Sequence, residues 1–148
     1  MKELSTGEIQ VTFPSDTVYV HMAITVASNA AMIAGFDKAM ASKVALATDE
    51  AVTNVIKHAY GSRPDRQITL KARITAESLT LKVVHTGKAL TNEEIKLPNM
   101  EKYIKARKPG GLGLYIMMQF MDEVDFLVGK EHCCQMTKYR NVDKSGAS

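Results

Sequence analysis

A carboxylate and a carboxamide stand one helical turn apart in the stretch DEAVTN, residues 49–54. Glu50 and Asn54 fall on one side of a helix because a turn takes 3.6 residues. A carboxylate in a partly closed site can act as a general base. A carboxamide oxygen beside it can ligate Mg²⁺, which keeps most of its waters and takes few protein ligands. The alternative is a solvated helix face that carries ordinary polar residues.

The glycine-rich stretch KPGGLGL, residues 108–114, is the second stretch whose residues could take part in chemistry. Gly110, Gly111 and Gly113 have no side chain, so backbone N–H groups there can approach a ligand closely. A helix that begins here adds unpaired N–H groups and the positive end of its dipole, which favour phosphate. The stretch has neither the ending of a Walker A loop nor the dinucleotide-binding fingerprint. A tight turn before a helix is the alternative.

Together the two stretches indicate a single site, because the first supplies a base and a magnesium ligand and the second supplies a phosphate cradle. The segment 88–108 precedes the cradle, shows weak periodicity and carries Pro98-Asn99 in its middle. We interpret it as a mobile segment with one short helix. The combination predicts a site for a nucleoside triphosphate under a lid.

The elements that must position these groups follow from periodicity and from turn residues. We expect helices over 17–34, 38–60 and 112–121, and strands over 8–13, 67–75, 78–85, 123–128 and 133–139. Ser15 or Asp16 and then Asp37 are the expected helix caps, and Gly61 ends the second helix. Short turns between neighbouring strands predict an α+β fold. It would be a two-layer sandwich, with a mixed, mostly antiparallel sheet and the helices on one face.

Composition limits the class of protein. The chain has 148 residues, of which 45% are hydrophobic and 24% charged, as expected for one domain over 1–148. We expect an ordered core of about 8–140 and a disordered C-terminal tail. No long apolar run and no signal peptide are evident, so we expect a cytoplasmic protein without a membrane span. The net charge of +3 is too mild to predict direct nucleic-acid binding.

Two stretches carry a family resemblance: LATDEAVTNVIKHAYG at 46–61 and GGLGLYIMMQFMDEV at 110–124. They resemble the anti-sigma-factor serine kinases of bacterial partner-switching systems. Those kinases belong to the histidine-kinase-like ATPase superfamily and have the Bergerat fold. The resemblance runs from about residue 8 to residue 140, and the expected order of elements agrees with that fold.

The resemblance implies a role for each motif residue. Glu50 would deprotonate a serine hydroxyl on a partner protein, and Asn54 would hold the Mg²⁺ that accompanies ATP. Backbone groups of the glycine-rich stretch would bind the phosphates; its residues are Gly110, Gly111, Leu112, Gly113 and Leu114. Lys108, or else Lys105 or Arg107, would meet the γ-phosphate. The implied partners are a STAS-type anti-anti-sigma protein and a sigma factor, with the kinase itself a homodimer.

The expected base pocket departs from the family pattern. The family has Asp-x-Gly-x-Gly after a strand, and its aspartate reads the adenine amino group. Here the stretch is HTGKA, residues 85–89, so Gly87 is kept and His85 replaces the aspartate. The family's last strand opens with Gly-Thr, which an ungapped alignment places at Glu131-His132. His85 and His132 would therefore form the adenine-reading pair.

This replacement leaves three functions open. A neutral imidazole can still accept one hydrogen bond, but it lacks the charge that roughly doubles the strength of such bonds. Loss of a buried polar partner typically costs about 1–3 kcal/mol. The protein is then an ATP-dependent serine kinase with weaker adenine recognition, a non-catalytic binding module of the same fold, or a protein whose pocket prefers another base.

Overall fold

The sheet has five strands in the order β1-β2-β3-β5-β4. The computed structural model of the chain describes residues 6–90 and 111–140. The strands are β1 (Gly7–Pro14), β2 (Gln67–Ile74), β3 (Ser78–His85), β4 (Glu123–Leu127) and β5 (His132–Tyr139). All four described pairings are antiparallel. The α+β class is therefore confirmed, with antiparallel pairing throughout these five strands.

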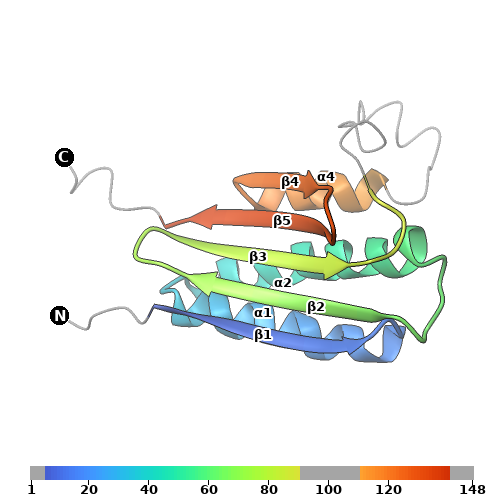
Figure 1. Cartoon of the computed structure of the whole chain (residues 1–148). Coiled ribbons are helices and arrows are strands. Elements are labelled where there is room, and N and C mark those ends of the chain that lie inside the picture. The colour runs from blue at the N-terminus through green and yellow to red at the C-terminus, as the bar shows by residue number, and fades with distance from the viewer. Residues whose placement is uncertain (1–5, 91–110, 141–148) are drawn as a thin grey trace.

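The helices of the described residues lie together on one face of the sheet (Figure 1). They are α1 (Val20–Ile33), α2 (Lys38–Asn54) and α4 (Gly111–Phe120), with short helical segments η1 (Thr17–Tyr19) and η2 (Val55–Ala59). This arrangement confirms the predicted two-layer sandwich. None of these helices combines the length and apolarity needed to cross a membrane.

Strand alternation explains why only one face of the sheet is covered. Along β2, the buried residues are Ile68, Leu70, Ala72 and Ile74, and the residues between them are more exposed. Successive side chains of a strand point to opposite faces, so one face packs on helices and the other meets water. The cysteines of β5 follow the same rule: Cys134 is buried, Cys133 is half-buried and both are free.

Two aspartates cap the N-terminal ends of helical segments. The Asp16 carboxylate accepts a hydrogen bond from Val18 N at 3.0 Å, and Asp37 accepts one from Met40 N at 2.8 Å. Both contacts are N-caps, which satisfy N–H groups that a helix leaves unpaired. Ser15, the other candidate cap, has a different role and bonds to the loop between α2 and β2.

The second helix differs from the expected continuous helix over 38–60. α2 ends at Asn54, and η2 is a π-helix in which Tyr60 N donates to Val55 O at 3.0 Å. A π-turn inserts an extra residue and shifts the helix face beyond it. The apolar pattern of the sequence runs through this point without a break, so periodicity could not reveal the change. Gly61 then ends the segment with φ of 58°, as predicted.

Candidate active site between α2, α4 and the ends of β3 and β5

Glu50 lies against the helix that follows the glycine-rich stretch. A Cβ atom built on Gly113 would collide with Glu50 Oε2 and lie 3.2 Å from Glu50 Cδ. Gly113 is itself buried. The absence of a side chain at Gly113 is therefore what lets the carboxylate sit there, and the two sequence motifs meet at this contact.

Asn54 lies one turn further along α2 and is buried, with 9% of its surface exposed. Its Nδ2 atom is 4.0 Å from the Sδ atom of Met117, at the outer limit of a hydrogen bond to sulfur. Met117 is a core residue of α4. Glu50 and Asn54 thus face α4, so the solvated helix face considered from the sequence is wrong for this pair. Lys43 and Lys57, on either side of this pair along the chain, are exposed.

The Glu50 carboxyl group has altered acidity. Partial burial raises its pKa above the ordinary value of 4.5, and the neighbouring Asp49 adds to the increase. The positive charge of Lys57 lowers the pKa of Glu50, but this effect is smaller than the other two. Desolvation favours the neutral form of a carboxyl group. A carboxylate with a raised pKa is a better proton acceptor, which suits a general base.

The start of α4 presents the predicted phosphate-binding backbone. Its first four residues are Gly111, Leu112, Gly113 and Leu114. The first four N–H groups of a helix have no partner within the helix. The side chain of Leu114 is buried in the core, which fixes this end of the helix against the rest of the fold. Lys108 and Gly110, together with the expected lid, lie outside the described residues.

His85 and His132 are direct neighbours across β3 and β5. Their ring centroids are 5.5 Å apart, and His85 is buried with 3% of its surface exposed. Burial, followed by the proximity of His132, lowers the pKa of His85 to about 4. The ring is therefore neutral at pH 7. The Nδ1 atom of His132 is also buried and has no hydrogen-bond partner in the described part of the chain.

The hydrogen bonding of His85 determines its tautomer. Gly87 N donates to His85 Nδ1 at 3.1 Å, so Nδ1 is the acceptor and the proton of the neutral ring resides on Nε2. The aspartate expected at this position could only accept hydrogen bonds at neutral pH. The structure thus brings the two histidines together as predicted, but the remaining nitrogen of His85 is a donor.

Gly87 is required by packing. A Cβ atom on it would lie 2.8 Å from Tyr60 Cδ1 and equally close to the carbonyl carbon of Ala59. Tyr60 in turn contacts His85 edge-on, with ring centroids 5.8 Å apart. Its hydroxyl donates to Gln67 O at 2.6 Å and accepts from Thr86 N at 2.9 Å. Sequence reasoning missed Tyr60; its only signal was its place beside Ala59 in the HAYG motif.

The donor set fits a hard cation. Magnesium prefers oxygen ligands and keeps several of its waters. Asn54 offers a buried carboxamide oxygen, Glu50 is one turn away, and the unpaired N–H groups of α4 lie beside them. Two oxygen-bearing side chains next to a helix N-terminus suit a magnesium–phosphate complex.

This geometry has a counterpart in known proteins. Residues 13–138 match the profile of the family described as histidine kinase-like ATPase domain. The chain belongs to this family. The matched range holds Glu50, Asn54, His85, His132 and all of α4. The contact between Glu50 and Gly113 therefore lies within a histidine kinase-like ATPase domain.

Similar proteins of known name come from several bacteria. The chain is 29% identical to the serine-protein kinase RsbW of Listeria innocua over 138 residues, which cover 90% of this chain and 88% of the relative. It is 35% identical to the anti-sigma F factor of a Thermoanaerobacter species over 100 residues, or 66% of this chain and 69% of the relative. The RsbW of Bacillus velezensis is 26% identical and covers 95% of this chain.

Proposed function

We propose that this ATPase-domain protein is a serine kinase that uses ATP and Mg²⁺ to phosphorylate a STAS-type anti-anti-sigma protein. In the same proposal it also binds a sigma factor and works in the cytoplasm as a homodimer of single-domain chains. The relatives named as serine-protein kinases and as an anti-sigma factor support this role. The observation that carries it is the Glu50 carboxylate held against Gly113, with Asn54 one turn away.

The proposed chemistry is one phosphoryl transfer. Glu50 accepts the proton of the partner's serine hydroxyl, and the serine oxygen forms a bond to the γ-phosphorus of ATP. The bond from that phosphorus to the bridging oxygen breaks, and ADP leaves. The N–H groups of residues 111–114 would hold phosphate oxygens, and Asn54 would hold Mg²⁺, which would offset phosphate charge. Catalysis in such a site is mostly positioning and charge stabilisation.

A second candidate function is a non-catalytic binding module of the same fold. The observation in its favour is the buried, neutral His85, which stands where the family has a charged acceptor for the adenine amino group. Nδ1 of His85 already accepts from Gly87 N and Nε2 carries the proton, so His85 has no free acceptor for that amino group, and this would weaken adenine binding. Under this alternative the protein would hold its sigma factor or anti-anti-sigma partner without turnover.

Calorimetric titration with ATP and Mg²⁺, and with GTP in parallel, decides between the two. The kinase proposal expects ATP binding in the micromolar range, followed by transfer of labelled γ-phosphate to a STAS-type partner from the same organism. Failure of ATP to bind at millimolar concentration would overturn the kinase proposal and support the binding module. A signal with GTP alone would assign the pocket to another base.

A substitution then tests whether Glu50 is the general base. Glu50→Gln keeps the size of the side chain but cannot accept the serine proton. It should reduce phosphoryl transfer by roughly 10²–10⁴-fold, the usual contribution of a general base, while ATP still binds. Glu77→Gln, on the exposed turn between β2 and β3, is the matched control and should leave transfer unchanged. Equal transfer by Glu50→Gln and wild type would remove Glu50 from the catalytic role.

A further inference from the structure

A cavity of about 310 Å³ lies beyond the end of α2. It is lined by Ala59, Tyr60, Arg63, Arg66, Thr86 and Gly87. Neither Glu50 nor Asn54 lines it, and Tyr60 is about 15 Å from Glu50 along the helix axis at 1.5 Å per residue. The cavity is therefore separate from the proposed position of the triphosphate.

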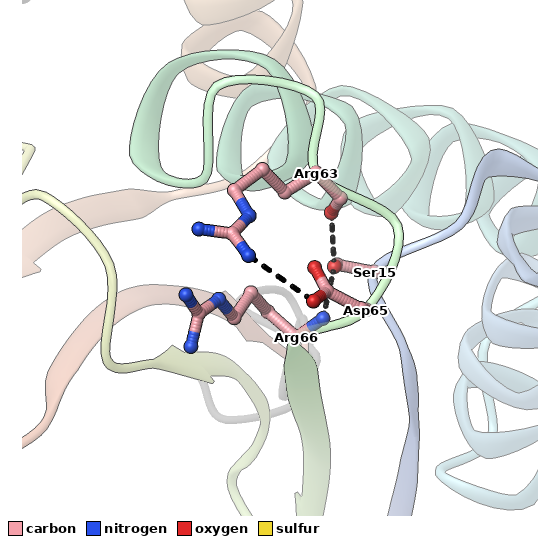
Figure 2. Close-up of polar contacts among 4 residues, drawn as sticks. All are labelled: Ser15, Arg63, Asp65 and Arg66. Atoms are coloured by element: carbon pink, nitrogen blue, oxygen red, sulfur yellow. Dashed lines mark hydrogen bonds and ion pairs between the residues drawn. The ribbon is translucent and has the colours of Figure 1, made fainter.

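The loop that carries the two arginines is held in place by one buried serine. Ser15 is 1% exposed; its hydroxyl donates to Arg63 O at 2.5 Å and accepts from Arg66 N at 3.0 Å. Ser15 N also donates to Arg66 O at 2.8 Å. Figure 2 shows this serine between the two arginines, at the base of the loop. Three hydrogen bonds to one residue fix the backbone from which both guanidinium groups project.

The same loop carries backbone strain. Ser62 has φ of 64°, a left-handed conformation that is costly for a residue with a side chain, and it follows the left-handed Gly61. The loop also follows directly from the π-helix η2, and π-turns occur frequently at functional sites. Strain that the surrounding structure maintains is typical of functional positions.

The cavity has an excess of positive charge. The guanidinium groups of Arg63 and Arg66 extend to the same side of the loop (Figure 2). Arg63 Nη2 lies 3.2 Å from Asp65 Oδ2, and within residues 6–90 and 111–140 this is the one ion pair that either arginine makes. Both partners of that pair are more than half exposed, and such pairs contribute little. A further anion can therefore bind without displacing a strong internal partner.

The other polar groups of the cavity wall are already occupied. Thr86 N donates to the Tyr60 hydroxyl, Gly87 N to His85 Nδ1, and Lys88 N to Ala59 O at 2.8 Å. The wall therefore lacks the convergent N–H groups of a typical phosphate cradle. The planar guanidinium fork matches a carboxylate with two parallel hydrogen bonds. The Tyr60 ring and Ala59 give the cavity an apolar part that suits the methylene groups of an acidic side chain.

We propose that this cavity binds an aspartate or glutamate side chain of a protein partner. It is a docking site for an acidic segment that adjoins the expected base pocket, with Gly87 at the boundary between the two. The proposal goes beyond the kinase reaction and does not depend on it, because the binding groups are Arg63 and Arg66 alone. Its test therefore needs no nucleotide.

The test is an NMR titration of the ¹⁵N-labelled full chain with capped triglutamate, and in parallel with capped triglutamine and with inorganic phosphate. Triglutamate at millimolar concentration should shift the amide signals of Thr86 and Gly87. The double variant Arg63→Gln/Arg66→Gln should bind it at least tenfold more weakly. Arg73→Gln, an exposed arginine on β2 outside the cavity, is the matched control and should bind it as wild type does.

The same NMR spectra would also show the outcomes that contradict the proposed carboxylate site. Unshifted Thr86 and Gly87 signals in wild type, or equal binding by the double variant, would overturn the site. Equal shifts with triglutamine would overturn the requirement for charge. Shifts with phosphate but not with triglutamate would overturn the assignment to a carboxylate. Both arginines are exposed, and the spectrum of each variant reports directly whether it is folded.

Discussion

At the scale of single residues, the contact between Glu50 and Gly113 connects the two halves of the site. The carboxylate occupies space that any side chain at residue 113 would fill. Its partial burial raises its pKa, so its surroundings also adjust its acidity. The close approach of α4 to α2 thus fixes the position of the carboxylate, while burial and the neighbouring Asp49 raise its pKa.

The first prediction concerns this contact. Gly113→Ala should lower phosphoryl transfer at least tenfold, because the new methyl group must displace the Glu50 carboxylate. Alanine is favoured over glycine in a helix by about 1 kcal/mol, so a loss of helix stability cannot explain a loss of activity. Transfer rates and circular dichroism are the measurements. Gly129→Ala is the control, since a Cβ atom there meets its nearest neighbour at an ordinary 3.5 Å.

The second prediction concerns His85, whose pKa of about 4 in the folded protein lies below its ordinary value of 6.5. Between these pH values the unfolded chain binds the proton and the folded one does not, so stability must fall as pH decreases from 6.5 to 4. A loss of roughly 1–3 kcal/mol is expected from this group. In His85→Asn, whose oxygen can replace Nδ1 as the acceptor for Gly87 N, this part of the pH dependence should disappear.

Urea denaturation at a series of pH values measures the effect as the difference between the two curves. The exposed His58 provides the control, and His58→Asn should keep the pH dependence of wild type. Parallel curves for His85→Asn and wild type across this range would show that His85 is not the group responsible.

At the scale of elements, the end of the second helix determines both sites. The π-turn in η2 places Ala59 and Tyr60 against Gly87, at the start of the segment that leaves β3. The left-handed residues Gly61 and Ser62 then turn the chain toward β2. Glu50 and Asn54, the proposed base and magnesium ligand, therefore lie in the last turn of α2, and the wall of the arginine cavity begins at the end of η2.

The third prediction follows from the strain in this turn. Ser62→Gly should raise the free energy of unfolding by about 0.5–1 kcal/mol, because glycine adopts a positive φ without the cost borne by serine. The same change at Ser42, an exposed position of α2, should lower it by about 0.5–1 kcal/mol. Urea denaturation of both variants gives opposite signs if the backbone at Ser62 is strained, and the same sign if it is not.

At the scale of the whole molecule, the helices cover one face of the sheet (Figure 1). The proposed nucleotide site involves both layers. Its parts come from α2, from α4 and from the adjacent ends of β3 and β5. Ligand that bridges these elements binds only the folded chain. Binding of this kind adds RT ln(1 + [L]/Kd) to stability.

The fourth prediction uses this linkage. ATP with Mg²⁺ should raise the midpoint of thermal unfolding, and at a concentration near 100 Kd the stabilisation is about 2.7 kcal/mol. Part of the increase should vanish with EDTA, and in Asn54→Ala that magnesium-dependent part should be absent. Asn29→Ala, on the exposed side of α1, is the control. A magnesium effect of the same size in Asn54→Ala would mean that Asn54 does not hold the ion.

The sequence by itself determined the elements and the candidate motifs, because periodicity, caps and glycines act locally. The strands, the positions of the helices apart from the π-turn at the end of the second, the Asp37 cap and the one-turn spacing of Glu50 and Asn54 all followed from neighbours along the chain. Family resemblance added the expectation that His85 and His132 would meet, and the register of β3 and β5 confirms it.

Tertiary structure decided whatever depends on residues far apart in the chain. Contact with Gly113 brings Glu50 to α4, and burial beside His132 keeps His85 neutral. The π-turn, the strain at Ser62 and the hydrogen bonds of Ser15 leave no local pattern, so the sequence did not single out Arg63 and Arg66. The physical reason is that desolvation, steric exclusion and presentation of charge are properties of packed surroundings.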